Sequence, residues 1–75
     1  MMDPVYIYET PQGGMVIAYY VETEVTAFFI VAFDDTSSEE EWGVGTSLQA
    51  ALQNAAEEWG EEEDNPFLQA LSSLA

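Results

Sequence analysis

The acidic side chains are the residues of this chain whose type and spacing point to a chemical role. Six carboxylates fall within positions 57–64, at the end of a predicted helix, and five more lie in segment 34–41. Residues four apart on a helix differ by about 6 Å in axial position, and duplex DNA carries one charge per about 3.4 Å along each strand. These rows predict a negative surface similar to, but sparser than, a nucleic-acid backbone. They comprise Glu57, Glu58, Glu61, Glu62, Glu63 and Asp64 in the first group and Asp34, Asp35, Glu39, Glu40 and Glu41 in the second.

No basic side chain opposes these carboxylates. The 75 residues include 15 Asp and Glu but no Lys, Arg or His, so the formal net charge is −15. Because 48% of the residues are hydrophobic and 13% are aromatic, we expect a folded domain and not a disordered acidic tail. A domain with this charge repels nucleic acid and attracts the basic proteins that bind nucleic acid.

The composition argues against an enzyme. Without His, Cys, Lys or Arg the chain has no ordinary pair of nucleophile and base, and no cation to hold an oxyanion or a phosphate. Neither acidic segment matches the spacing of an EF-hand calcium loop, so calcium binding is the weaker interpretation. We expect a binding protein that uses no cofactor and no metal.

One predicted helix carries the first acidic group. Its apolar residues recur at intervals of three and four and define one face that should lie on a sheet. Thr46 and Gln49 fit a capping box at its start, and Gly60 fits a left-handed stop after Trp59. The carboxylates crowd the end at which the helix dipole disfavours negative charge. This unfavourable placement favours a functional interpretation of the group. The apolar positions are Leu48, Ala51, Leu52, Ala55, Ala56 and Trp59.

The rest of the chain predicts strands and a second helix. Runs of alternating or β-branched residues favour strands, and Asn65-Pro66 fits a cap followed by the first residue of a helix. We expect a single α+β domain over residues 1–75, with a three-stranded antiparallel sheet packed by the long helix, or with a short fourth strand as the alternative. The predicted strands are Val5–Glu9, Met15–Glu22 and Val25–Phe33, with a reversal at Glu22–Glu24, an acidic loop at Asp34–Glu41, a short extended piece at Trp42–Gly45 and a helix at Pro66–Leu74.

Both faces of the third predicted strand are apolar. One helix covers one face of a sheet, so the second face needs the C-terminal segment or another protomer. Trp42 and Trp59 are interpreted as packing residues, whereas Tyr6, Tyr8 and Tyr20 fit either an exposed sheet face or the seam of a homodimer. No apolar run is long enough to span a bilayer and no leader is visible, so a cytoplasmic protein without membrane contact is expected.

The chain resembles a known family over residues 5–59. The order of three strands and a helix, and the segment GVGTSLQAALQNA at positions 43–55, are similar to the small HicB-type antitoxin domain. This resemblance implies oligomerisation and neutralisation of a basic RNA-cleaving toxin. The chain lacks the basic DNA-binding tail, so the resemblance does not extend to operator binding. In size and acidity alone, the chain also resembles phage-encoded DNA-mimic inhibitors such as anti-CRISPR proteins.

The function predicted from the sequence is an acidic nucleic-acid mimic. Such an inhibitor would block the DNA- or RNA-binding groove of a basic protein such as a CRISPR effector or a nuclease, and would act as an anti-CRISPR or other anti-defence protein in the cytoplasm of a host cell. It would not bind nucleic acid itself. The alternatives are a HicB-like antitoxin module that masks a basic toxin, and an acidic oligomeric protein of the halophile type that has no electrostatic target.

Overall fold

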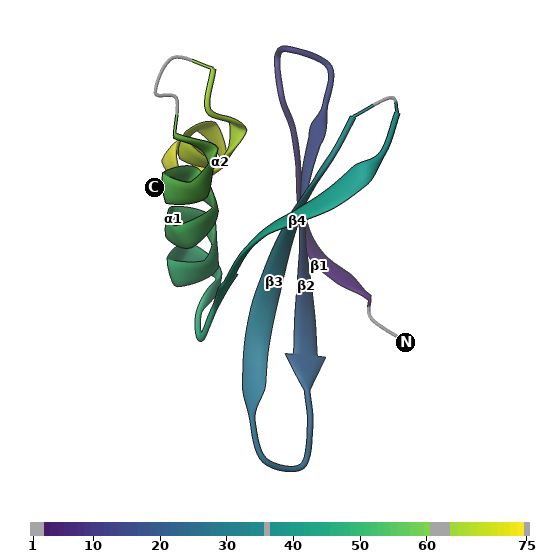
Figure 1. Cartoon of the computed structure of the whole chain (residues 1–75), viewed down its shortest axis with the longest axis vertical. Helices are drawn as coiled ribbons and strands as arrows, with labels where there is room; N and C mark the ends of the chain where they lie inside the picture. The colour runs from purple at the N-terminus through teal and green to yellow at the C-terminus, as the bar shows by residue number, and fades with distance from the viewer. Residues whose placement is uncertain (1–2, 36, 61–63, 75) are drawn as a thin grey trace.

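A four-stranded antiparallel sheet with two helices on one of its faces forms the fold (Figure 1). The computed structural model describes residues 3–35, 37–60 and 64–74. The elements are β1 (Pro4–Glu9), β2 (Met15–Glu22), β3 (Ala27–Asp34), β4 (Glu39–Gly45), α1 (Leu48–Trp59) and α2 (Pro66–Leu74), and the strands lie in sequence order across the sheet. The α+β class is confirmed, and the alternative with a fourth strand is the correct one. In these ranges no helix has the length and hydrophobicity needed to cross a bilayer.

The core lies between the helices and the face of the sheet beneath them. Val16, Ala18 and Val31 alternate with residues of the opposite face, as the two-residue period of a strand requires. They are fully buried, as are Leu52 of α1 and Phe67 of α2. Three alanines of α1 complete its buried face and let the helix approach the sheet closely: Ala51, Ala55 and Ala56. The apolar face predicted for this helix is therefore the face that packs on the sheet.

Helix α1 ends where the sequence predicted, but its N-cap is one residue later than predicted. The N-cap is Ser47 and not Thr46, because the Ser47 hydroxyl accepts a hydrogen bond from the Ala50 amide at 3.1 Å. Gly60 ends the helix as predicted. Its φ of +81° lies in the left-handed region, and its amide donates to the Ala56 carbonyl.

Segment 39–45 is a full strand, which corrects the prediction of an acidic loop that reaches Glu41. β4 pairs with β3, and the extra residue at a bulge opposite Val31 and Ala32 is Trp42. Two glycines then allow α1 to lie directly against this strand. A Cβ atom on Gly43 would be 2.5 Å from the Ala51 carbonyl oxygen, and one on Gly45 would be 2.5 Å from the Ala51 amide nitrogen.

The β2–β3 hairpin turns at residues 23–26, later than the predicted reversal at Glu22–Glu24. The Thr23 amide donates to the Thr26 carbonyl at 2.7 Å. The Thr23 hydroxyl accepts from the amides of Val25 and Thr26. These side-chain bonds satisfy the turn backbone, so the turn forms without a residue of positive φ. As a result β3 begins at Ala27 and not at Val25.

The second helix packs beside α1 on the same face of the sheet (Figure 1). The Tyr6 hydroxyl of β1 donates to the Ala70 carbonyl at 3.3 Å and lies 2.8 Å from the Ser73 hydroxyl. Tyr6 and Tyr8 are partly buried and pack against the core, so they do not form the exposed sheet face that was one of the two interpretations. Tyr20 also lies on this side, beside Phe29, and is 39% exposed. The C-terminal segment consequently leaves the opposite face of the sheet uncovered.

Asn65 joins the two helices. Its side-chain oxygen accepts from the amides of Phe67 and Leu68 at 3.0 and 3.3 Å, which confirms the predicted cap of α2. Its side-chain amide donates to the Ala56 carbonyl at the end of α1 at 3.0 Å. The residue is only 2% exposed, so water does not replace these bonds readily.

Replacement of Asn65 tests this junction. We expect Asn65→Ala to lower the free energy of unfolding by about 2 kcal/mol, because it removes the cap of α2 and one of the two donors to the Ala56 carbonyl, which keeps only the Gly60 amide. Asn65→Asp keeps the cap acceptor and loses only the donor, and it should therefore separate the two effects. The measurement is urea denaturation followed by tryptophan fluorescence. An Asn65→Ala protein as stable as the wild type would contradict the role of the junction.

Candidate functional site

An open acidic groove runs between β4 and α1. Its volume is about 600 Å³. Two carboxylates come from β4 and two from the last turn of α1, and all four side chains are exposed. The groove thus brings together two of the six carboxylates of the first predicted group and two of the five of the second. Its lining consists of Glu40, Glu41, Trp42, Gly43, Val44, Asn54, Glu57 and Glu58.

Packing and hydrogen bonding fix the width of the groove. Gly43 lies against the backbone of α1, which sets the separation of strand and helix. The Asn54 side-chain amide donates to the Val44 carbonyl at 2.7 Å and ties the two elements together. The carboxylates therefore project from two elements whose relative position is held by backbone contacts.

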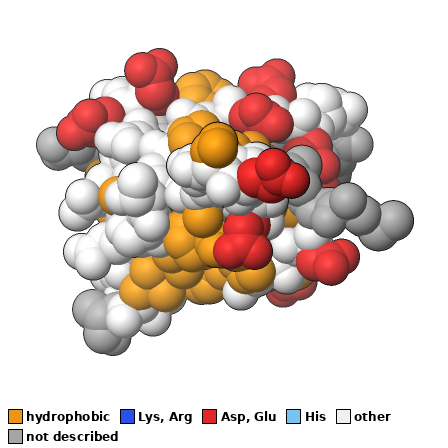
Figure 2. Space-filling view, turned by 90° about the horizontal axis from the view of Figure 1, so that it is seen from below, with side chains coloured by type: hydrophobic (Ala, Val, Ile, Leu, Met, Phe, Trp, Pro, Cys, Tyr) orange, Lys and Arg blue, Asp and Glu red, His pale blue; other side chains and the backbone are white. Residues whose placement is uncertain are grey.

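All charged side chains that line the groove are negative. The chain contains no Lys, Arg or His, so no side chain of its own neutralises these four groups. Glu57 and Glu58 also lie near the negative end of the α1 dipole, which adds to their repulsion. Figure 2 shows acidic side chains beside exposed hydrophobic ones and no basic side chain on the visible surface. A cation brought by another molecule would relieve the repulsion.

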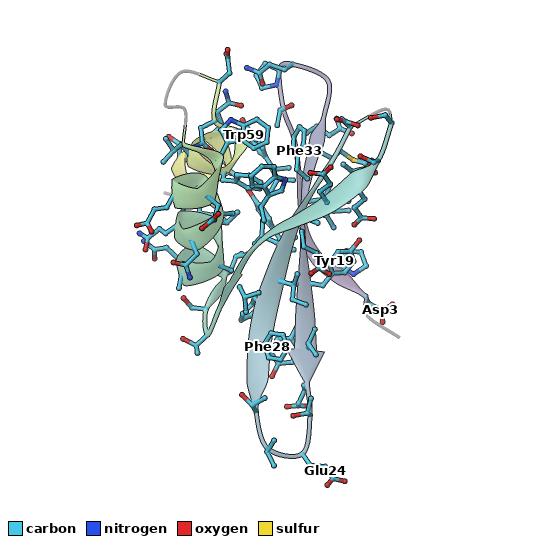
Figure 3. The ribbon with its side chains drawn as sticks, in the orientation of Figure 1. Asp3, Tyr19, Glu24, Phe28, Phe33 and Trp59 are labelled. Carbon is cyan, nitrogen blue, oxygen red and sulfur yellow. The ribbon has the colours of Figure 1, made fainter. Side chains whose placement is uncertain are left out.

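Two smaller hollows continue the acidic surface around an aromatic cluster. One hollow of about 200 Å³ shares Glu40 and Trp42 with the groove and adds Asp35. The next, of about 370 Å³, contains Asp35 and Asp64. Phe33 and Trp59 line both hollows and lie between sheet and helix in Figure 3. The acidic surface therefore extends from the groove to the start of α2.

The aromatic cluster supports this surface from beneath. The ring centroids of Trp42 and Trp59 are 4.9 Å apart, and the Trp59 ring is 5.7 Å from Phe67. Phe67 is fully buried, whereas both indoles are partly exposed. The two tryptophans are thus packing residues, as predicted, and their accessible edges line the groove and the hollows.

Asp35 is held by its own loop. Its carboxylate accepts hydrogen bonds from the Ser37 hydroxyl at 2.7 Å and from the amides of Ser37 and Ser38 at 2.8 and 3.0 Å. The Ser37 hydroxyl and these two amides lower the pKa of Asp35 below its ordinary value. The carboxylate therefore stays charged at neutral pH and is fixed in place by the loop.

Glu39 lies on the face of the sheet that is turned away from the helices, where it interacts with Tyr19. The Tyr19 hydroxyl donates to the Glu39 carboxylate at 2.6 Å. This hydrogen bond, with some burial and the charges of Glu39 and Asp34, raises the pKa of Tyr19 from 10.0 to about 12. The folded protein therefore holds the phenolic proton more tightly than the unfolded chain does. The stabilisation is complete below about pH 10 and is lost as the pH rises from 10 to 12.

Loss of this hydrogen bond should be visible in a tyrosine titration. In the wild type we expect one tyrosine to ionise near pH 12, and Tyr19→Phe should remove that step. Glu39→Gln should move the step down toward 10, because both the charge and the strong acceptor are gone. Ultraviolet absorbance of the tyrosinate form gives the measurement. Glu22→Gln, which acts beside Tyr20, is the control and should leave the Tyr19 step in place.

The predicted site residues fall into four groups. Glu40, Glu41, Glu57 and Glu58 line the groove, and Asp35 and Asp64 line the neighbouring hollows. Asp34 ends β3, where it pairs with Met15 of β2 and Glu39 of β4. Asp34 and Glu39 lie on the face of the sheet away from the helices. The remaining three, Glu61, Glu62 and Glu63, lie outside the described residues.

Four residues of the groove were not among the predicted site residues: Trp42, Gly43, Val44 and Asn54. Asn54 and Val44 connect α1 to β4 through the bond that sets the groove geometry. An exposed polar residue inside an otherwise amphipathic helix gives no signal that distinguishes it from ordinary surface. Only the GVG segment at positions 43–45 hinted at a close approach of another element.

Comparison with models of protein families, with curated proteins and with solved structures gives no match. The geometry and charge of the chain are therefore the basis for a functional conclusion. In the part of the chain that the structure describes, no three acidic side chains are placed to hold a metal ion.

Proposed function

We propose that this protein is an acidic inhibitor that occupies the nucleic-acid-binding groove of a basic protein. The observation that carries the proposal is the convergence of Glu40 and Glu41 with Glu57 and Glu58 around one groove, in a chain with no basic side chain. In this mechanism the carboxylates take the place of phosphates against Lys and Arg of the target. The inhibitor acts by occupying the groove and turns over no substrate.

The kind of partner follows from the sign and the arrangement of the charge. Nucleic acid is repelled by a net charge of −15, whereas a groove rich in Lys and Arg is attracted over a distance of about one Debye length, roughly 10 Å at 0.1 M salt. Carboxylates fixed on a strand and a helix also lose less conformational freedom on binding than carboxylates of a flexible tail.

Several classes of target share such a groove. CRISPR effectors, nucleases and repressors all bind nucleic acid through Lys and Arg, so an anti-CRISPR or other anti-defence role belongs to this proposal. The HicB-like resemblance points to a basic RNA-cleaving toxin, which would be bound by the same contact. The nucleic acid that competes for the target separates these possibilities.

The test is affinity capture from bacterial lysate with this protein as bait. Capture is compared at about 0.05 M and about 0.5 M salt, with and without excess duplex DNA or RNA. We expect one basic nucleic-acid-binding protein to be retained at low salt, released at high salt and displaced by one type of nucleic acid. Retention that responds to neither salt nor competitor would overturn the proposal, as would the absence of any specific partner.

A further inference from the structure

The face of the sheet turned away from the helices is apolar, and none of the described helices or strands covers it. Three of its side chains are about half exposed: Val5 at 55%, Ile7 at 54% and Val44 at 50%. Tyr19 projects from this side in Figure 3. Strand alternation and register place further apolar residues here, which are Ile17, Val21, Phe28, Ile30 and Ala32.

These residues form one dense surface and not a scatter of single side chains. Ile17 is 8% exposed and Ala32 only 1%, although both helices lie on the other face (Figure 1). Their neighbours on adjacent strands therefore cover them. Contiguous apolar surface of this kind is typical of an interaction site.

Carboxylates border this surface on two sides. Glu9 lies opposite Met15 in the β1–β2 pair, and Asp34 lies opposite Glu39 in the β3–β4 pair. Glu41 lies opposite Ala32. Glu39 reaches onto the surface, since it accepts the hydrogen bond of Tyr19. The border therefore has a negative charge that no side chain of the chain compensates.

The charge of the border decides between two possible occupants. A second copy of the chain would bring these carboxylates against the same carboxylates, and like charges across an interface oppose association. A different protein with an apolar centre and a border of Lys and Arg would match both the centre and the border. Charge complementarity thus favours the second occupant.

We propose that the outer face of the sheet is a docking surface for a protein patch with an apolar centre bordered by Lys and Arg. The proposal concerns a surface other than the acidic groove and does not depend on the function proposed for that groove. Glu41 and Val44 line the groove and also belong to β4 of this face. One basic partner could therefore contact both surfaces across the β4 edge.

The test uses two synthetic helical peptides of equal positive charge. One has a Leu face flanked by Lys, and in the other each Leu is replaced by Ser. We expect the Leu-Lys peptide to bind at least about tenfold more tightly, because only it fills the apolar centre. In the double variant Val5→Ser/Ile7→Ser, the affinity for the Leu-Lys peptide should fall to that for the Ser-Lys peptide. Val25→Ser is the matched control, since Val25 is 92% exposed at the tip of the β2–β3 hairpin, and it should keep the preference.

Further arms make the result decisive. Circular dichroism confirms that each variant is folded, and a peptide of Leu and Glu should not bind. The proposal is overturned if both Lys peptides bind equally, or if Val5→Ser/Ile7→Ser keeps the preference. A homodimer in sedimentation that Ile7→Ser dissociates would also overturn it, because the surface would then hold a second copy. The Glu57→Gln/Glu58→Gln variant should keep the Leu preference, so a failure of the groove proposal is recognised separately.

Discussion

Replacing the four groove carboxylates with Gln is expected to weaken binding to the captured basic partner by about 100-fold at about 0.05 M salt. Exposed ion pairs contribute about 0.2–1 kcal/mol each and desolvated interfacial pairs more. Four such losses give about 3 kcal/mol, which corresponds to about two powers of ten in affinity. The difference from the wild type should shrink as salt is added, because screening weakens the pairs that remain. Isothermal titration calorimetry across a salt series measures both effects. The substitutions are Glu40→Gln, Glu41→Gln, Glu57→Gln and Glu58→Gln.

A charge-matched control separates the groove from net charge. Glu57→Gln/Glu58→Gln should weaken binding by about tenfold, whereas Glu22→Gln/Glu24→Gln should change it little. Glu22 ends β2 and Glu24 lies in the turn that follows, and both are exposed. Glu24 lies at the end of the molecule opposite Trp59 (Figure 3). Equal losses in the two pairs would show that only total charge matters, and the groove would then have no specific role.

The same variants also report on folding. Glu57 and Glu58 lie in the last turn of α1, where the helix dipole disfavours negative charge by about 0.3–1 kcal/mol per residue. The Gln variant should therefore be as stable as the wild type or slightly more stable. Weaker binding together with equal or higher stability identifies a functional contact, because general damage to the fold would lower both.

Gly43→Ala is expected to have the largest effect on stability. The new Cβ would lie 2.5 Å from the Ala51 carbonyl oxygen and from the Ala55 amide nitrogen. Both are backbone atoms of α1, so no side-chain rotation relieves the overlap and the helix has to move off the sheet. We expect a loss of about 3 kcal/mol or more, a large part of the roughly 4–11 kcal/mol available to a domain of this size. Thermal denaturation followed by circular dichroism measures the loss.

Gly13→Ala provides the comparison for this variant. Gly13 has φ +99°, and no other group lies within 4 Å of a Cβ built on it. Its replacement should therefore cost only the strain of the left-handed backbone, about 1–2 kcal/mol. If Gly43→Ala were no more destabilising than Gly13→Ala, the close approach of α1 to β4 would be absent. The groove would then need a different explanation.

The sequence was sufficient for features that depend on neighbouring residues. Alternation located β1 and β2, and the spacing of Leu48, Ala51 and Leu52 located the buried face of α1. Asn65 and Gly60 marked helix ends, because a cap or a left-handed stop requires only local geometry. The boundary errors have local causes as well. Ser47 and Thr46 are both capping residues, and the hydroxyl of Thr23 shifted the hairpin turn.

The strand at Glu39–Gly45 shows where local reasoning failed. Three consecutive Glu residues have low strand propensity, and the sequence therefore predicted a loop. Pairing with the apolar β3 overrides this propensity, because the backbone groups of β3 need a partner along that edge. Glu39 and Glu41 then face one side of the sheet and Glu40 the other, an arrangement that follows only from strand formation.

The sequence by itself determined the sign of the charge, the absence of any basic side chain and the existence of two amphipathic layers. Only the tertiary structure decided that Glu40 and Glu41 meet Glu57 and Glu58, since this depends on the β3–β4 register and on the contact of Gly43 with α1. It also decided that α2 lies beside α1 and leaves the other sheet face open. The physical reason is that charge and periodicity belong to single residues and short segments, whereas proximity depends on how separate segments pack.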